Sequence, residues 1–283
     1  MTRIGTININ VAIFLAGVFA MTPSFEAFTQ QSVIHSLAAP VVQHTFWNGY
    51  PEDTFVQEGP HYLIVLPNSL TPDRPCIWRP EFFGAYDQAD QTLLAKGYPI
   101  AYMDMNNIFG SPPAMELMDK YYDYLIANYP LAAKTTLFGF SRGALYSVNW
   151  TARHPDRVAC LYLDAPVCDI KSWPGGRGKG NGSPADWERL KVFYGFTNDQ
   201  EALDYQHNPV DNLKPLAAAK IPILSVCGDA DTTVPYLENT AILKTRYEAL
   251  GGSMQVIVKP CCDHHPDSLI DPKPIVDFVL KSN

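Results

Sequence analysis

The sequence has few charged residues, and fewer basic than acidic ones. Of its 283 residues 18% are charged, with 21 Lys and Arg against 29 Asp and Glu, which gives a formal net charge of -8. Proteins that bind nucleic acid need clustered Lys and Arg to contact phosphates. Here these residues are scattered, apart from a modest group around Arg177 and Lys179. The composition therefore argues against nucleic acid as the main partner.

Patterns for metal and phosphate binding are also missing. The six cysteines follow no zinc-ligand spacing. The glycine-rich stretch 172–184 lacks the spacing G-x-x-x-x-G-K-[ST], and no helix directly follows its lysine, so it is not a phosphate-binding P-loop. We therefore expect neither a metal nor a cofactor.

The sequence leaves the pairing of the cysteines open. Cys160 and Cys227 fall in predicted buried strands, where a lone cysteine behaves as a small hydrophobic residue. A bond of Cys168 with Cys261 or Cys262 is conceivable, because both loops should lie at the same edge of the predicted sheet.

No apolar run reaches the length of a comfortable transmembrane span. The N-terminal run 11–20 is too short, but it follows Arg3 and is followed by small residues at Ala20 and Ala27. This pattern predicts a secretory signal over 1–27, export to the periplasm or the medium, and no stable membrane insertion after signal removal. The alternative is an apolar N-terminal helix that stays in the fold.

The rest of the chain alternates strands with helices. At 47% hydrophobic residues, a chain of this length can bury one substantial core, so we expect one domain over 28–283. Strands are expected at 45–47, 53–56, 61–67, 76–79, 99–103, 135–138, 158–163, 221–227 and 255–259, and helices at 87–96, 114–128, 142–153 and 185–194. The alternation predicts an α/β fold with a doubly wound, mostly parallel sheet, opened by antiparallel strands. Reactive loops of such sheets gather at the carboxyl ends of the strands.

The most informative motif is G-x-S-x-G, formed by Gly139, Ser141 and Gly143 between a predicted strand and a predicted helix. Such a strand-turn-helix presents a serine outward as a nucleophile, and the glycines let strand and helix approach closely. We predict that Ser141 is a nucleophile. The alternative is a serine that makes only a local hydrogen bond.

An acid and a base follow Ser141 in the order Ser, Asp, His, each in a loop after a predicted strand. This order is typical of α/β-hydrolases and differs from that of trypsin-like and subtilisin-like enzymes. Asp231 and His264 are the favoured acid and base, with Asp229 and His265 as their rivals.

Stabilisation of an oxyanion should use the backbone N–H of Arg142 and a second N–H from the loop after the strand 76–79. Pro80 has no N–H, so Glu81 or Phe82 is expected to supply it. The Arg142 side chain can assist the oxyanion or bind a substrate carboxylate. A merely structural role is less favourable, because a cation at a helix start opposes the helix dipole.

The long insertion 166–215 interrupts the alternation and is predicted to form a partial lid over the site. Within it, Trp173 is a candidate to stack on a sugar ring, and Arg177 and Lys179 are candidates to bind substrate. Arg79 would add positive potential to the same rim.

Four segments together resemble a family of exported bacterial α/β-hydrolases that are carbohydrate esterases, a group with pectin methylesterase activity. These segments are W-R-P-E-F-F-G at 78–84, N-I-F-G-S-P at 107–112, G-F-S-R-G at 139–143 and P-V-C-D-I-K-S-W-P-G-G at 166–176. The G-x-S-R-G motif is similar to that of glucuronoyl esterases. The resemblance implies that Ser141, Asp231 and His264 form the catalytic triad and that Arg142 supports the oxyanion.

Two details of the resemblance concern the acid and the base. The sequence resembles the family's G-x-H-H-P ending, in which the first histidine acts, and the usual spacing of the acid before Val-Pro favours Asp231. Cys261 and Cys262 depart from the glycine that relatives usually carry near the histidine.

The function that the resemblance implies is an exported serine esterase that removes methyl esters of uronic acids from pectin-type polysaccharide or oligosaccharide. Three rival hypotheses remain. They are an acetyl esterase on plant polysaccharide, a peptidase of the same fold, and a catalytically dead sugar-binding relative.

Overall fold

The computed structural model describes residues 41–56, 61–69, 75–105, 107–265 and 267–283. The described residues form nine strands, which are β1 Val41–Trp47, β2 Tyr50–Val56, β3 Tyr62–Val65, β4 Ile77–Arg79, β5 Ile100–Met103, β6 Thr135–Phe140, β7 Val158–Asp164, β8 Ile223–Gly228 and β9 Met254–Lys259. The α-helices are α1 Gln88–Ala95, α2 Pro112–Asn128, α3 Gly143–Arg153, α4 Pro184–Tyr194, α5 Asp199–Leu203, α6 Lys214–Ala218, α7 Thr240–Ala249 and α8 Lys273–Ser282. Two short 3-10 helices cover Pro155–Arg157 and Tyr236–Glu238.

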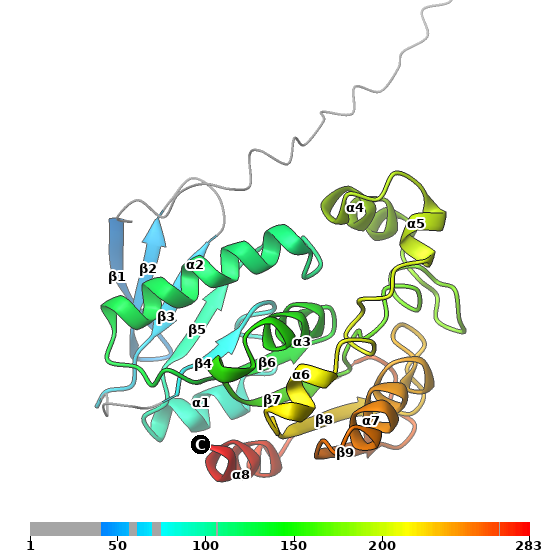
Figure 1. The fold of residues 1–283 in the computed structure, drawn as a ribbon. Coiled ribbons are helices and arrows are strands. Elements are labelled where there is room, and N and C mark those ends of the chain that lie inside the picture. Colours follow the sequence, from blue (N-terminus) through cyan, green and yellow to red (C-terminus); the bar gives the residue numbers. More distant parts are fainter. Residues whose placement is uncertain (1–40, 57–60, 70–74, 106, 266) are drawn as a thin grey trace, which may run out of the picture.

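All nine strands join one sheet in the order β1-β2-β3-β5-β4-β6-β7-β8-β9 (Figure 1). The pairs β1–β2, β2–β3 and β3–β5 are antiparallel, and the pairs from β5–β4 to β8–β9 are parallel. The predicted doubly wound, mostly parallel sheet with antiparallel opening strands is confirmed. Because β4 lies between β5 and β6, the loop that leaves β4 is placed beside the loop that leaves β6.

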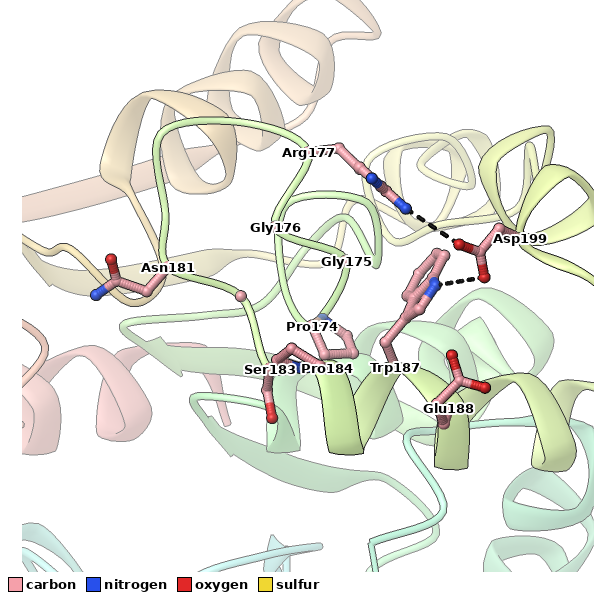
Figure 2. A pocket seen from close by; sticks show the side chains of 11 residues that line it. Pro174, Gly175, Gly176, Arg177, Asn181, Ser183, Pro184, Trp187, Glu188 and Asp199 are labelled. Atoms are coloured by element: carbon pink, nitrogen blue, oxygen red, sulfur yellow. Dashed lines mark hydrogen bonds and ion pairs between the residues drawn. The ribbon is translucent and has the colours of Figure 1, made fainter.

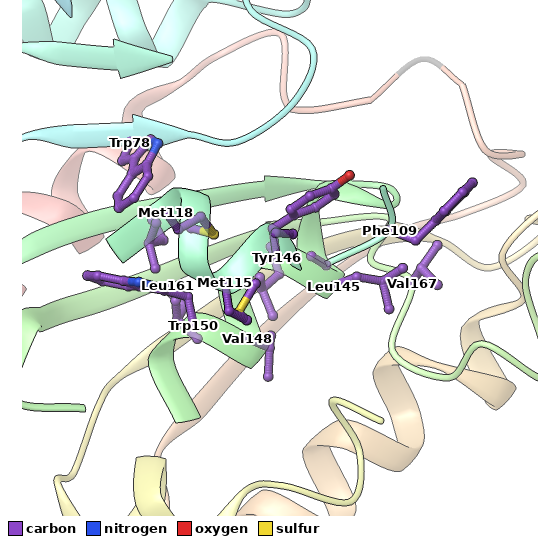
Figure 3. Packing of buried hydrophobic residues seen from close by; sticks show 14 of the residues in the cluster. Trp78, Phe109, Met115, Met118, Leu145, Tyr146, Val148, Trp150, Leu161 and Val167 are labelled. Carbon is purple, nitrogen blue, oxygen red and sulfur yellow. The ribbon is translucent and has the colours of Figure 1, made fainter. Parts of the chain in front are cut away.

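The two faces of the sheet carry separate hydrophobic cores. Successive residues of a strand point to opposite faces, so Leu137 packs into one core and Phe138 into the other. Helices α2, α3, α6 and α7 cover the first face, and α1 and α8 cover the second (Figure 1). In the first core Trp78 of β4 meets Trp150 of α3 edge to face, with 5.2 Å between ring centroids (Figure 3).

The insertion 166–215 contains α4 and α5 and ends in the first turn of α6. Helix α4 begins after Ser183, whose hydroxyl accepts a hydrogen bond from the Asp186 N–H, and ends at Gly195 in the left-handed conformation. The predicted helix 185–194 is therefore present. Helix α6 packs against α3, and its buried Leu216 lies in the first hydrophobic core, so the chain returns to the main core where the insertion ends.

All six cysteines lie in the described residues, and none forms a disulfide bond. Cys168 is buried, whereas Cys261 is exposed. The conceivable bond between Cys168 and Cys261 or Cys262 is therefore absent. Cys160 and Cys227 are buried in β7 and β8, as expected.

The segment 1–27, predicted to be a secretory signal, lies outside the described residues. Within the described residues, each helix is too short or too polar to cross a bilayer.

Candidate active site

Ser141 lies at the sharp turn between β6, which ends at Phe140, and α3, which begins at Gly143. Its φ of 48° is in the left-handed region, which side chains other than glycine rarely adopt. The Ser141 N–H donates to the Asp164 carbonyl at 2.8 Å, and its carbonyl accepts from the Val167 N–H at 3.0 Å. The strained turn is thus fixed by hydrogen bonds to the segment at the end of β7.

The two glycines of the motif contribute unequally to this turn. A Cβ on Gly139 would lie 2.8 Å from the Cα of Ala144, a distance that real Cβ atoms do not tolerate. A Cβ on Gly143 would lie 3.4 Å from the Cβ of Glu81, which is close to ordinary van der Waals contact. Close approach of strand and helix therefore requires glycine at position 139 and only favours it at position 143.

His264 links Ser141 to Asp231. Its Nε2 lies 3.0 Å from the Ser141 Oγ, and its Nδ1 lies 2.8 Å from the Asp231 Oδ2. Asp231 follows β8 and His264 follows β9, so both side chains reach Ser141 from the carboxyl end of the sheet. His264 and Asp231 are only 8% and 6% exposed, which shields their hydrogen bond from water. The three predicted residues are therefore brought into one continuous hydrogen-bonded chain.

The Asp231 carboxylate is held in place by backbone donors. Its Oδ1 accepts from the N–H groups of Thr233 and Val234, at 2.8 and 2.7 Å. Its Oδ2 is left to accept from His264, so that the Nδ1 of His264 carries the proton and the Nε2 is free to accept one.

The rival residues lie elsewhere. The His265 side chain is 66% exposed, and its Nδ1 lies 3.3 Å from Asp267. The Asp229 Oδ1 accepts from the Cys261 N–H at 2.6 Å, so Asp229 connects two loops. The geometry selects His264 and Asp231 over His265 and Asp229.

The pKa of His264 reflects opposing influences. Burial lowers the pKa, but the hydrogen bond and negative charge of Asp231 raise it, and the charges of Asp267 and Asp164 act in the same direction. The net result is a pKa above the ordinary value of 6.5. Asp164 itself is fully buried at the end of β7, and burial raises its pKa to about 7.

Asp263 joins the loops of the acid and the base. Its Oδ1 accepts from the backbone N–H groups of both Thr232 and His264, each at 2.8 Å. Sequence reasoning gave Asp263 no role, because a single aspartate before a histidine carries no pattern that reveals its partners. Asp263 is a positioning residue, because its carboxylate joins the loops that carry Asp231 and His264.

Arg142 and Glu81 form an ion pair beside Ser141. One guanidinium nitrogen of Arg142 lies 3.3 Å from the Glu81 Oε2, and its Cζ lies 4.7 Å from the centre of the Phe82 ring. Burial raises the pKa of Glu81, and the charge and hydrogen bond of Arg142 oppose this shift. Glu81 and Phe82 belong to the loop after β4, as expected for the second oxyanion donor, although the expectation concerned the backbone N–H and not this side-chain pair.

Arg79 is not at the rim of the site. Its side chain is fully buried, donates to Asp90 at 2.6 Å and to the Ala85 carbonyl at 2.8 Å, and lies over the ring of Phe140. The prediction that Arg79 binds substrate is therefore wrong. As the last residue of β4, it points into the protein and joins α1 to the sheet.

Trp173 is also unavailable for stacking on a sugar ring. It is only 8% exposed and packs against Phe109, with 6.1 Å between ring centroids. The sequence W-P-G-G suggested an exposed aromatic residue, but Trp173 lies in the first hydrophobic core. Its substrate-binding role is contradicted, because its ring face is covered by other side chains.

Arg177 and Lys179 are exposed on the glycine-rich loop. Arg177 pairs with Asp199 at 3.2 Å, and the backbone N–H of Lys179 donates to Glu238 at 2.5 Å. The same loop donates from the Asn181 N–H to the Thr232 carbonyl at 3.0 Å. The loop is therefore attached to the segment that carries Asp231. Glu238, which holds this loop, was missed because no motif marks it.

A hollow of about 400 Å³ lies between this loop and helix α4 (Figure 2). Its lining includes Pro174, Arg177, Trp187, Glu188 and Asp199, with Asp199 bound to both Arg177 and Trp187. The lining contains none of the three residues of the hydrogen-bonded chain, so this hollow is separate from Ser141. In the described residues, no group of three or more His, Cys, Asp or Glu side chains could hold a metal ion.

Comparison with known proteins shows the fold. No family model and no curated protein matches the sequence. Among solved structures the chain is similar to two bacterial proteins, described as a dipeptidyl aminopeptidase IV and a dipeptidyl peptidase 4. One is from Bacteroides ovatus, with 15% identity and a TM-score of 0.59. The other is from Porphyromonas gingivalis, with 16% identity and a TM-score of 0.62.

These matches cover 86% and 83% of this chain, but the chain spans only 35% and 36% of those two proteins. It is also similar to Est1E from Butyrivibrio proteoclasticus, with 16% identity and a TM-score of 0.56, over 85% of this chain and 98% of Est1E. The protein has the α/β-hydrolase fold.

Proposed function

We propose that the protein is a serine hydrolase that cleaves carboxylic esters. The observation that carries the proposal is the chain of hydrogen bonds from Ser141 through His264 to Asp231, at 3.0 and 2.8 Å. A serine becomes a nucleophile when a neutral imidazole accepts its proton and a carboxylate stabilises the resulting imidazolium.

In the proposed reaction, Ser141 Oγ attacks the ester carbonyl while its proton passes to His264 Nε2. The oxyanion accepts hydrogen bonds from the Arg142 N–H and from the N–H of Glu81 or Phe82. The tetrahedral intermediate collapses, and the leaving alcohol takes the proton from His264. Water, activated by the same imidazole, then cleaves the acyl-enzyme and releases a carboxylic acid.

For the substrate we favour methyl esters of uronic acids in pectin-type polysaccharide or oligosaccharide. The four segments that resemble pectin methylesterases support this choice, and so does a guanidinium adjacent to the nucleophile. With Arg79 and Trp173 buried, Arg142 is the leading candidate for substrate contact, and Arg177 and Lys179 are exposed candidates on the glycine-rich loop. This function fits export to the periplasm or the medium, which we propose from the apolar segment 11–20.

Peptide hydrolysis is the second candidate, because two of the similar structures are described as dipeptidyl peptidases. A substrate panel separates the candidates. It comprises methyl-esterified oligogalacturonide, acetylated xylose and a prolyl p-nitroanilide. We expect the highest kcat/KM with the methyl ester. A preference for acetylated xylose or the anilide would reject the favoured substrate and leave the hydrogen-bonded chain unaffected.

Labelling tests the catalytic proposal itself. A fluorophosphonate should modify the protein at Ser141, as located by peptide mapping, and should not modify Ser141→Ala. The matched control is Ser172→Ala, which removes a hydroxyl bound to Glu238 and Asn239 and to none of Ser141, His264 and Asp231. This variant should label like the unchanged protein. Failure of the folded protein to label would favour a catalytically dead sugar-binding protein.

A further inference from the structure

Two adjacent thiols reach solvent in the loop between β9 and His264. Among the six cysteines, all in the described residues, Cys261 is exposed and Cys262 is partly exposed, while Cys76, Cys160, Cys168 and Cys227 are buried. Burial raises the pKa of Cys76 to about 12 and the pKa values of Cys160 and Cys227 to about 11. It also raises the pKa of Cys168. Buried, protonated thiols are unreactive, so thiol chemistry concentrates on the adjacent pair.

The backbone of this pair supports the loop of the acid. The Cys261 N–H donates to Asp229 at 2.6 Å, and the Cys262 carbonyl accepts from the Ala230 N–H at 3.0 Å. The contact is tight, since a Cβ on Gly228 would lie 2.1 Å from the Cys262 carbonyl oxygen. The peptide groups on either side of the two cysteines therefore pack on the loop that carries Asp231, and His264 follows Cys262 two residues later.

We propose that Cys261 and Cys262 are a modification site that forms a disulfide ring by exchange with a low-molecular-weight disulfide, and that closure of the ring displaces His264. Adjacent Cα atoms lie about 3.8 Å apart, whereas disulfide-bonded residues usually have Cα atoms about 4.4–6.8 Å apart. The ring includes the peptide bond that joins the two residues, so closing it sets the torsions ψ of Cys261 and φ of Cys262. A change in these torsions turns the peptide groups on either side of the ring, which hold the hydrogen bonds to Asp229 and Ala230, and we expect those bonds to break.

The exchange balances without any further reactant. The Cys261 thiolate attacks one sulfur of the disulfide RSSR, the S–S bond breaks, and RS⁻ leaves and takes a proton. The Cys262 thiolate then attacks the Cys261 sulfur of the mixed disulfide, and a second RS⁻ leaves and takes a proton. Two cysteine thiols are oxidised and RSSR is reduced to two RSH. A ring with unfavourable Cα spacing is easily reduced, so a dithiol reverses the modification.

The test uses the whole protein and oxidised glutathione. We expect the intact mass to fall by two hydrogen atoms, and peptide mapping to link Cys261 with Cys262. Hydrogen–deuterium exchange should rise in the loops 228–234 and 260–265. Labelling of Ser141 by a fluorophosphonate should slow by about tenfold or more, because a small displacement of a general base has a large effect on rate. Dithiothreitol should reverse all four changes.

Cys261→Ser and Cys262→Ser are the matched controls. Each keeps the Ser141 labelling rate of the reduced protein but cannot close the ring. Two glutathione adducts in place of the ring, or a closed ring with unchanged hydrogen exchange, would overturn the inference. The effect on rate rests on the proposed function, whereas the mass and exchange measurements do not. If the reduced protein is never labelled at Ser141, the proposed hydrolase function is rejected. The intact mass and the hydrogen–deuterium exchange still test the cysteine site in that case.

Discussion

The Arg142 guanidinium lies 3.3 Å from the Glu81 carboxylate, although 61 residues separate the two along the chain. The pair joins the loop after β4 to the beginning of α3, which are the two segments expected to supply the oxyanion donors. It exists because β4 is inserted between β5 and β6 in the sheet. We infer that the pair positions these donors and, at the same time, partly neutralises the cation next to Ser141.

Replacing Arg142 with alanine should destabilise the protein, because it leaves the Glu81 carboxylate buried without a charged partner. The expected loss is about 1–3 kcal/mol in the free energy of unfolding. The pKa of Glu81 is already raised above its ordinary value of 4.5, and without Arg142 it should rise further. A group with a raised folded-state pKa loses its contribution to stability as pH rises through that value. The stability deficit of Arg142→Ala should therefore grow as pH rises above the raised pKa that Glu81 has in the unchanged protein, as measured by urea unfolding at several pH values.

The control for this prediction is the double variant Arg142→Ala with Glu81→Gln. Removing the ionisable group should abolish the pH-dependent part of the deficit. An equal deficit at all pH values in both variants would show that Arg142 acts through packing on Phe82 and not through Glu81.

Substitution of His264 by alanine should lower kcat by about three orders of magnitude or more, since the Ser141 proton loses its acceptor. Steady-state kinetics on an activated ester provides the measurement. His265→Ala is the matched control, because its side chain is 66% exposed. It should keep kcat within about threefold of the unchanged protein. The reverse result would transfer the role of the base to His265.

Asp231→Asn should lower kcat by about 10⁴-fold, because the amide no longer fixes the tautomer of His264 or stabilises its charged form. Asp229→Asn is the matched control in the same loop and should have a much smaller effect. Comparable losses in both variants would mean that the loop, and not the acid, determines activity.

The pH dependence of kcat/KM should show an acid limb with its midpoint above pH 6.5. His264 must be neutral to accept the Ser141 proton, and its pKa is raised above that value chiefly by Asp231. Activity should therefore fall as pH decreases through the raised pKa. In Asp231→Asn the residual activity should have a lower midpoint. The pKa of His264 is lowered by burial, and the variant loses the negative charge of Asp231 that raises it. An unchanged midpoint would contradict the assignment of this limb to His264.

Arg79→Ala should reduce stability and leave substrate binding unchanged. Removing one partner of the buried pair with Asp90 should cost about 3–5 kcal/mol in the free energy of unfolding, measured in urea. The exposed pair of Arg177 and Asp199 offers a control, and Arg177→Ala should cost about 1 kcal/mol or less. A raised KM with normal stability in Arg79→Ala would instead restore Arg79 to the substrate site.

Some substrate-binding predictions failed because the sequence does not say which way a polar or aromatic side chain points. Arg79 is the last residue of a strand buried on both faces, and Trp173 stands in a glycine-rich segment that looks like a surface loop. Each finds a buried partner on another segment, Asp90 for Arg79 and Phe109 for Trp173. Local composition cannot reveal such partners.

The sequence alone determined the α/β fold and the positions of Ser141, Asp231 and His264 at the ends of three strands. It could do so because strand periodicity and tight-turn chemistry are local properties, and parallel strands bring their carboxyl ends to one edge. Tertiary structure alone decided between His264 and His265, paired Arg142 with Glu81, and placed Cys261 and Cys262 against the loop of the acid. These outcomes depend on distances between segments that are remote in the chain, and only packing fixes such distances.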